Sequence, residues 1–368
     1  MGPHQSKAIQ TKLDSNEKTL NFSSISPLAK ISSLGETTTA ETITATVASS
    51  GESHQSEDST AAKKKIAAAR VNTLEAKTWN PSNPESWDPG MREYHSLPNS
   101  DYVLPTDADE QDRLETQHYI LRATFQGDIV CPSVKDLLDG PGVKVLDVGC
   151  AKGFWLECIK KQYSFAECHG CDISQTLVEG PARSDGIVLK FGNVLETLPY
   201  EDDSFDFVHQ RYMVLGMPRE KFPTALRELI RVTKSGGWIE LVEGDMVMYD
   251  AGPHSRTLGT ALFDALHGRG LDCYAASNLP YYTQQVSNNV ENQQMTTVQF
   301  PLNWGASRIG ALCGANMKAA SLGMEDWMHK AMNISREEYR ELLDDCVNEW
   351  TESKTYMKTR ALYFQVKK

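Results

Sequence analysis

The sequence contains no run of 18 apolar residues, so we expect no membrane-spanning helix. Its first thirty residues lack the basic start and the apolar run of a secretory signal. Cations are in the minority, because 37 lysines and arginines face 49 aspartates and glutamates and leave a net charge of −12. Binding to a nucleic-acid backbone relies on clustered cations. We therefore expect neither a membrane nor a nucleic acid as a partner.

Cysteines are few, and aromatic residues are almost missing from the beginning of the chain. Eight cysteines in 368 residues, without a secretory signal, indicate reduced thiols and a cytoplasmic protein. Of the aromatic residues (7 Trp, 13 Tyr and 11 Phe) only Phe22 precedes Trp79, and residues 1–60 hold 12 serines and 9 threonines. Such a segment cannot bury enough apolar surface to offset the entropy of ordering it. Residues 1–78 are therefore predicted to form a disordered, Ser/Thr-rich tail.

The tail carries one concentrated charge, the three lysines at residues 63–65. We interpret them as the solvated start of a short helix. The alternative is a nuclear import signal, which would make the protein nuclear and would let the tail bind a regulatory protein partner.

Residues 79–142 are predicted to form an N-terminal segment that is irregular at first and then helical over residues 110–125. On that helix Glu110, Arg113, Leu114, Gln117 and His118 recur at a spacing of three and four residues, which puts them on one face. A mixed polar face next to a core suits the wall of a substrate or cofactor site. The alternative is the surface of an ordinary capped helix.

A strand, a glycine turn and a helix follow one another from residue 143. Residues 143–148 are a short apolar run bounded by glycines, which is typical of a buried parallel strand. Gly149 and Gly153 enclose the turn, and residues 154–163 are predicted to be helical. Glycines let the backbone approach a ligand closely, and the helix N-terminus presents unpaired N–H groups. This succession opens a nucleotide-binding α/β unit.

The later segments indicate an α/β fold with a doubly wound, mostly parallel, seven-stranded sheet. Further strands are predicted over residues 166–173, 186–191, 204–210 and 238–242, with a helix over residues 218–232. Helices are then expected over residues 254–268, 307–322, 324–332 and 335–353, and a closing antiparallel strand over residues 360–366. Residues 254–358 are expected to form a helical cap, whose methionines and aromatics either roof a hydrophobic acceptor pocket or only pack the core.

The glycine turn separates two cofactor classes. A dinucleotide-binding turn needs G-x-G-x-x-G, whereas this sequence has G-C-A-K-G followed by Phe154. The pattern D-x-G-x-G-x-G wraps the amino-acid end of S-adenosylmethionine, and it fits from Asp147 to Gly153 with Ala151 in place of the middle glycine. Asp172 follows the turn by ~20 residues, where a carboxylate can accept both ribose hydroxyls.

The succession DVGCAKGFW, CDIS, GNVLETLPYEDDSFDFVHQR and RVTKSGGWIELVE resembles the class I S-adenosylmethionine-dependent methyltransferases. Within them, HQR and GGWIE are similar to the fungal LaeA-like group, as are Tyr102-x-Leu104-Pro105 and Arg113-Leu114-x-x-Gln117-His118. The resemblance covers about residues 91–250. It implies a Rossmann-like methyltransferase domain over residues 143–368 and S-adenosyl-L-methionine as the cofactor.

The resemblance also implies roles for individual residues. Asp147 holds the turn, Asp172 binds the ribose hydroxyls, and Gln210 lies with His209 under the sulfonium. The remaining implied contacts are Gly149, Cys150 and Gly153 at the methionine end, Ile173 against the adenine face, and Asn193 with Val194 at the adenine amino group. Each role has a structural alternative. Gly149 and Gly153 could serve only the turn, Asp172 could cap the following helix, and His209 could be a hydrogen-bonded core histidine.

The sequence assigns no general base. Methyl transfer needs the acceptor, the methyl group and the sulfur in line, and it needs a base only when the acceptor is protonated. His118 and His209 are the candidate catalytic residues, with Glu243 as a third. We interpret Cys168-His169-Gly170-Cys171 as packing residues and expect no metal, because no second C-x-x-C occurs and strand side chains alternate between faces.

Two functions remain open at this point. The first is an enzyme that methylates an O, N or S atom of a small organic acceptor in specialised metabolism. The alternative is a LaeA-like regulatory interaction protein that retains a methyltransferase fold.

Overall fold

The computed structural model describes residues 18–19, 92–94, 102–174, 178, 186–305 and 308–368. The predicted disordered tail, with its three lysines, therefore lies outside the described residues, except for a two-residue strand, β1 (Lys18–Thr19). None of the helices in the described ranges is both long enough and apolar enough to cross a membrane.

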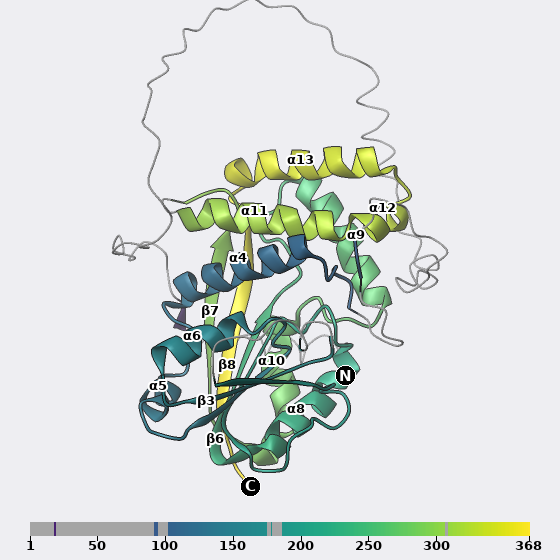
Figure 1. Ribbon diagram of the computed structural model, residues 1–368. Helices are drawn as coiled ribbons and strands as arrows, with labels where there is room; N and C mark the ends of the chain where they lie inside the picture. The colour runs from purple at the N-terminus through teal and green to yellow at the C-terminus, as the bar shows by residue number, and fades with distance from the viewer. Residues whose placement is uncertain (1–17, 20–91, 95–101, 175–177, 179–185, 306–307) are drawn as a thin grey trace, which may run out of the picture. The chain divides into compact units, whose positions relative to one another are not determined.

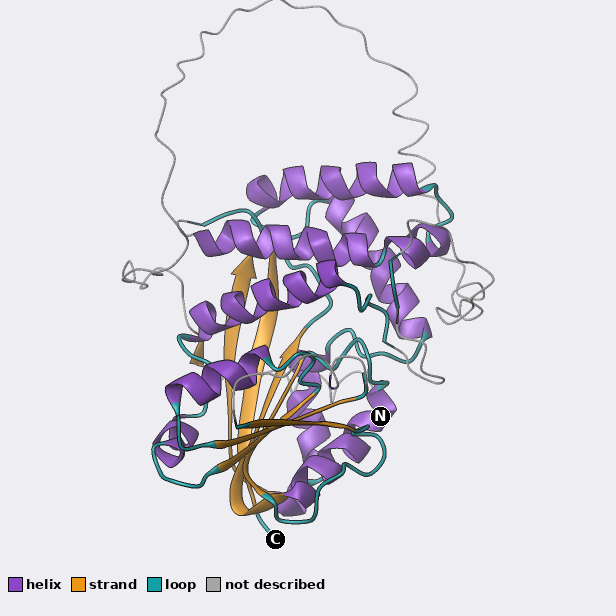
Figure 2. Cartoon of the chain, viewed as in Figure 1, coloured by secondary structure: helices purple, strands orange, loops and turns teal. Residues whose placement is uncertain are grey.

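The described strands form a single mixed sheet (Figure 2). Besides β1 it contains β2 (Lys144–Val148), β3 (Glu167–Asp172), β4 (Ile187–Phe191), β5 (Phe205–Arg211), β6 (Thr233–Gly244), β7 (Val290–Pro301) and β8 (Tyr356–Val366). The strand order is β1-β7-β8-β6-β5-β2-β3-β4. Strand β8 runs antiparallel to β6 and β7, and the other pairs are parallel. The mostly parallel α/β sheet with an antiparallel closing strand is thereby confirmed.

Helices cover both faces of this sheet. Helices α5 (Pro132–Leu138) and α6 (Phe154–Gln162) pack on one face, where Trp155, Leu156 and Phe207 belong to one buried cluster. Helices α8 (Phe222–Val232) and α10 (Ala275–Gln284) pack on the other face. Strand β2 is buried on both sides, which is why its sequence is a continuous apolar run instead of an alternating one.

A second group of helices gathers beyond the carboxyl end of the parallel strands (Figure 1). It comprises α4 (Ala108–Phe125), α9 (Pro253–Gly268), α11 (Arg308–Gly323), α12 (Glu325–Ala331) and α13 (Arg336–Ser353). Helix α11 lies along α4, and α13 packs on α9. Fully buried Trp327, Tyr339 and Trp350 hold the group together. At the start of α13 Ser335 and Glu338 form a capping box, which fixes where that helix begins.

Two stretches differ from the sequence-based expectation. Strand β6 already begins at Thr233, because the predicted turn at residues 234–237 is a bulge opposite β5 instead of a break in the chain. The predicted cap at residues 254–358 also contains helix α10 and strand β7, which belong to the sheet and its flank. Strand β7 begins with the polar residues Glu291 to Gln294 and so gives little hydrophobic signal.

Candidate functional site

The glycine turn links the carboxyl end of β2 to helix α6. Gly149 and Gly153 adopt φ values of +75° and +76°, which favour glycine. Ala151, in the place of the middle glycine, also has a positive φ of 46°. A Cβ at position 149 would lie 2.6 Å from Sδ of Met213. Position 149 therefore has no room for a side chain, because Met213 packs directly against the backbone there.

Asp172 ties the turn to the end of β3. One carboxylate oxygen accepts the N–H of Ala151 at 2.8 Å, and the other accepts the N–H of Ser174 at 2.8 Å. The carbonyl of Cys171 accepts the N–H of Gly149 at 2.8 Å. Burial raises the pKa of Asp172, while these backbone donors favour its charged form. Each carboxylate oxygen has more than one lone pair, so both can still accept a ligand hydroxyl.

The other predicted cofactor residues follow the next strands. Ile173 comes directly after Asp172 and is half-buried. After β4, Asn193 uses its Oδ1 to accept the N–H of Leu195 at 3.0 Å, and Val194 is buried. The structure thus brings these three residues to the same carboxyl edge of the sheet as the glycine turn.

Gln210 presents an unpartnered polar atom at this edge. It pairs with Val148 across β5 and β2, immediately before the glycine turn. Its side chain is buried, and its Oε1 has no hydrogen-bond partner among the described residues. An unpartnered buried amide oxygen is costly. Cys150, in the turn itself, is also buried, and burial together with Asp172 raises the pKa of its thiol well above the usual range.

His209 lies on the opposite face of β5 from Gln210, because successive strand residues alternate. Its Nδ1 is 2.8 Å from Oδ1 of Asp147, and both side chains are buried. Its ring stacks on the indole of Trp155, with centroids 4.1 Å apart and planes inclined by 6°. Asp147 is therefore occupied by His209, and the three side chains brace the first turn of α6 against the sheet.

His118 lines the same small cavity as His209, one of about 290 Å³ between α4, α6 and the sheet. Its Nδ1 lies 3.1 Å from Nη1 of Arg211, and its Nε2 lies 3.3 Å from Sγ of Cys158. Burial and the positive charge of Arg211 lower the pKa of His118 to about 3. His118 is therefore neutral at physiological pH.

Two residues of the small cavity, His118 and Asp128, belong with Cys158 to a group that could ligate a metal. His118, Asp128 and Cys158 place one ligand atom each within 4.8 Å of one another, a donor set that suits zinc. However, the guanidinium N–H of Arg211 points at Nδ1 of His118, so that nitrogen offers its lone pair and Nε2 carries the ring proton. Arg122 lies 3.5 Å from the Asp128 carboxylate. The guanidinium groups of Arg211 and Arg122 therefore take the positions beside His118 and Asp128, and we interpret the group as an ion-paired network.

Cys168 and Cys171 do not form a common ligand set either. Both are buried, but they belong to two different hydrophobic clusters on the two faces of the sheet. This agrees with the interpretation of the C-x-x-C segment as packing residues.

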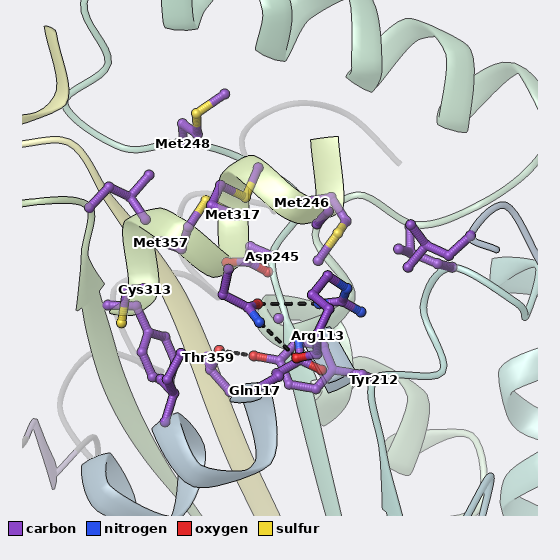
Figure 3. Close-up of a pocket in the computed structure, with 18 of the residues that line it drawn as sticks. Arg113, Gln117, Tyr212, Asp245, Met246, Met248, Cys313, Met317, Met357 and Thr359 are labelled. Atoms are coloured by element: carbon purple, nitrogen blue, oxygen red, sulfur yellow. Dashed lines mark hydrogen bonds between the residues drawn. The ribbon is translucent and has the colours of Figure 1, made fainter. Parts of the chain in front are cut away.

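A much larger cavity, with about 1130 Å³ of empty space that is partly open to solvent, lies at the carboxyl end of the sheet. It is bordered by the ends of β5, β6 and β7 and the start of β8, and by α4, α9 and α11. We call it the large pocket. Five methionines line it: Met246, Met248, Met317, Met324 and Met357. In Figure 3 four of them gather on one side, opposite Arg113, Gln117, Tyr212 and Thr359.

Helix α4 supplies the polar wall that its sequence predicts. Arg113, Leu114 and Gln117 line the large pocket, and Glu110 binds Arg113 through both carboxylate oxygens at 2.8 and 2.7 Å. His118, on the same predicted face, points instead into the small cavity. Helix α11, which belongs to the predicted cap, contributes Cys313, Asn316, Met317 and Ala320 to the lining.

One loop joins the large pocket to the glycine turn. Tyr212 directly follows β5 and has a positive φ of 51°. It lines the pocket and shares a 2.7 Å hydrogen bond with Oγ1 of Thr359. Met213, the next residue, packs against Gly149. Glu243 holds this loop by accepting the N–H of Met213 at 2.8 Å, and burial raises the pKa of Glu243 to about 8.

The sequence-based account missed Tyr212, Met213 and Thr359 as site residues. Positions 212 and 213 directly follow the HQR motif, and that adjacency was the available signal. Thr359 lies 147 residues further along the chain and no local pattern marks it.

The comparisons with known proteins agree with this geometry. Residues 145–237 match a family model described as a methyltransferase domain. The match runs from β2 into β6, so it includes the glycine turn, Asp172 and the end of β5.

Individual proteins match over longer or shorter stretches. The chain is 30% identical over 156 residues to the N-methyltransferase sirN of Leptosphaeria maculans, which covers 42% of this chain and 54% of that protein. It is 26% identical over 249 residues to the methyltransferase str2 of Strobilurus tenacellus, which covers 62% of this chain and 86% of that protein. A solved phosphoethanolamine N-methyltransferase 2 of Haemonchus contortus aligns with a TM-score of 0.38 at 13% identity, over 71% of this chain and 59% of that chain.

The chain covers from 50% to 54% of the length of the four fungal N-methyltransferases that match at 30% or 31% identity. Residues 145–237 are therefore similar to a methyltransferase domain, and they lie in a mixed sheet with the strand order β1-β7-β8-β6-β5-β2-β3-β4.

Proposed function

We propose that this protein is an S-adenosylmethionine-dependent methyltransferase that methylates an O, N or S atom of a small organic acceptor in specialised metabolism. The observation that carries the proposal is the junction at Tyr212 and Met213. Met213 packs on the glycine turn, and Tyr212 lines a pocket large enough for an organic molecule. A cofactor on the turn and an acceptor in the pocket would therefore meet at this loop.

The residues around the turn suit S-adenosylmethionine. Gly149, Cys150 and Gly153 would approach its methionine part, and Asp172 would accept the ribose hydroxyls. Ile173, Asn193 and Val194 would border the adenine, and the unpartnered Oε1 of Gln210 would gain a donor. When bound, the cofactor supplies a methyl group on a sulfonium: the acceptor lone pair bonds to the methyl carbon, and the electrons of the breaking carbon–sulfur bond pass to sulfur.

The protein's own part is to position the acceptor and to exclude water. Orientation alone can contribute roughly 7–11 kcal/mol to a two-reactant step. His118 and His209 line the small cavity instead of the large pocket, and Glu243 is engaged with backbone N–H groups. We therefore assign these three residues to holding the scaffold, and the acceptor proton, where there is one, would leave to water.

The fungal relatives support nitrogen as the acceptor atom. The four proteins that match at 30% or 31% identity are named N-methyltransferases. Of the three acceptor atoms predicted from the sequence, we give nitrogen the first place in a product screen.

The LaeA-like subgroup is part of the same proposal. Tyr102, Leu104, Arg113, Leu114 and Gln117, which belong to the segments that resemble this group, all line the large pocket. The alternative function, a regulatory interaction protein that retains the fold, depends on the tail and on a protein partner. Removing residues 1–78 separates the two: an enzyme keeps its product formation, whereas a regulator loses partner binding.

The proposed function is tested by thermal melting of the full chain with and without S-adenosylhomocysteine. At ~100 times its dissociation constant a ligand adds ~2.7 kcal/mol to the stability of the folded state. We expect the melting temperature to rise for the wild type and for Asp344→Ala, an exposed control on α13, but not for Asp172→Ala. A folded wild type without any rise would contradict cofactor binding.

A further inference from the structure

The large pocket has few charges, and each charge has a partner. Arg113 is neutralised by Glu110 and also donates to Oδ1 of Asn316 at 3.2 Å. Asp245 is completely buried and accepts from Arg360 at 3.0 Å and from Ser277 at 2.8 Å. The guanidinium and the carboxylate are therefore already bound within the protein.

Lys358 is the third charged residue of the lining. Its ammonium lies over the ring of Tyr249, 4.3 Å from the ring centroid, which directs the charge to that aromatic face. Among the described lining residues, then, no carboxylate is left to bind a cationic acceptor, the charge of Arg113 is balanced by Glu110, and the charge of Lys358 is directed to the face of the Tyr249 ring. Moving an unpaired charge out of water into such a site costs several kcal/mol.

Most of the remaining lining is apolar and adaptable. Methionine side chains are unbranched and polarisable, so they fit ligands of irregular shape. Four of the five methionines of the large pocket lie together on the side opposite Arg113 and Gln117 of α4 (Figure 3). A pocket lined in this way favours ligands with a large apolar surface and accepts ligands of different shapes.

A neutral pair of hydroxyl groups interrupts this surface, in addition to the amides of Gln117 and Asn316. The hydroxyls of Tyr212 and Thr359 share one hydrogen bond of 2.7 Å, so the pair retains one O–H donor and several lone pairs for a ligand. Burial raises the pKa of Tyr212, which keeps its hydroxyl protonated. The pair can therefore bind an uncharged hydroxyl, amide or amine without a change of protonation.

We propose that the large pocket takes an uncharged, largely apolar acceptor whose polar group hydrogen-bonds to the Tyr212–Thr359 hydroxyl pair. The inference rests on the proposed function, since it names the class of acceptor for that reaction. It distinguishes the pocket from sites that hold amino acids or phosphate esters, which need an unpaired counter-charge.

The test compares three probes with one ring system and different charge: 2-naphthol, 2-naphthoate and 2-naphthylmethylammonium. Their dissociation constants with the full chain at pH 7.5 are measured by titration calorimetry. We expect 2-naphthol to bind at least about tenfold more tightly than either charged probe. Equal or tighter binding of a charged probe, or no binding of 2-naphthol, would overturn the proposal.

The place of binding is tested with variants of α9. At Gly259, which lines the pocket, a Cβ would lie 3.6 Å from Cε of Met248. Gly259→Leu should therefore fill the pocket and weaken 2-naphthol binding at least about tenfold. Gly268→Leu is the matched control, because nothing lies within 4 Å of a Cβ there. An unchanged 2-naphthol affinity in Gly259→Leu would also overturn the proposal.

The hydroxyl pair is tested with Tyr212→Phe and Thr359→Val. Each should weaken 2-naphthol about fivefold, as expected for one lost hydrogen bond, and leave the affinity for naphthalene unchanged. Equal losses for both probes would mean that the pair only supports the pocket wall. S-adenosylhomocysteine binding, measured on the same samples, keeps the two proposals apart, because its absence contradicts the methyltransferase function and leaves the probe comparison intact.

Discussion

Helix α4 separates two cavities of opposite character. On one side is the large pocket, with about 1130 Å³ of empty space and five methionines. On the other is the small cavity of about 290 Å³, which holds both predicted catalytic histidines and is bordered by Arg122, Arg211 and Asp128. Leu121 contributes to both linings.

The two cavities show that the titratable residue types of this fold gather away from the space that could hold a ligand. In the small cavity the titratable side chains contact one another. These contacts hold α4 and α6 to the sheet. In the large pocket the polar groups are few and largely neutral, and there is room for a ligand. We therefore expect changes in the small cavity to alter stability, and changes at the large pocket and the glycine turn to alter binding.

Removing His209 should have the largest effect. His209→Ala takes away the hydrogen-bond partner of the buried Asp147 carboxylate, and breaking a buried pair from one side costs about 3–5 kcal/mol. Urea unfolding of the full chain measures the loss. The exposed His267→Ala on α9 is the control and should change stability by less than about 0.5 kcal/mol. An unchanged unfolding midpoint for His209→Ala would contradict the claim that residues of the small cavity stabilise the fold.

Crowding the junction at Tyr212 should have the next largest effect. In Gly244→Ala the new Cβ would lie 2.7 Å from Cε1 of Tyr212, whose ring is held by Thr359, and such overpacking costs about 1–3 kcal/mol. The same change at Gly259 meets only an ordinary contact at 3.6 Å. Because alanine is favoured over glycine within a helix by about 0.5–1 kcal/mol, Gly259→Ala should stabilise the protein. Equal effects at the two glycines would contradict the packing described for Tyr212.

The neutral state of His118 should make stability depend on pH. The pKa of His118 is about 3 in the folded protein and about 6.5 in an unfolded chain, so the unfolded chain binds the proton first as the pH falls. The contribution of His118 is complete above pH 6.5 and is lost progressively between about pH 6.5 and 3. The stability difference between the wild type and His118→Gln should therefore shrink from pH 7 to pH 4. Parallel pH profiles would show that His118 is not buried as a neutral residue.

The smallest effect is expected at Ala151. A left-handed conformation costs an L-residue roughly 1–2 kcal/mol, and part of this is offset because glycine has a freer unfolded chain. Ala151→Gly should therefore raise the free energy of unfolding by about 0.5 kcal/mol. A loss of stability would mean that the methyl group of Ala151 makes packing contacts worth more than the strain.

Much of the sheet could be predicted from the sequence, since its strands are apolar runs bounded by glycines and polar turns. Strand β2 differs from the predicted residues 143–148 by one residue, and α6 from the predicted 154–163 by one. Strand β7 and helix α10 gave no clear signal, because the strand begins in a polar stretch and the helix has Pro280 inside it. Long-range pairing with β8 stabilises β7, and no local pattern encodes that pairing.

The candidate site was predictable only where it is local in sequence. The glycine turn, Asp172 and Gln210 follow successive strands, so the strand-by-strand pattern brought them to one edge. The opposite orientations of His209 and Gln210 could also have been inferred from strand alternation. The large pocket could not be predicted from the sequence. Its lining residues come from segments more than 200 residues apart, such as Arg113 on α4 and Asn316 on α11.

The most direct test of the account measures S-adenosylhomocysteine binding by titration calorimetry in the wild type, Asp172→Asn and His118→Gln. The first variant changes a polar residue at the glycine turn, and the second changes one in the small cavity. We predict that Asp172→Asn weakens binding by about ten- to a hundredfold, as expected for lost hydrogen bonds to a charged group. His118→Gln should bind within about threefold of the wild type. The reverse order, with His118→Gln impaired and Asp172→Asn intact, would place the ligand in the small cavity and contradict the account.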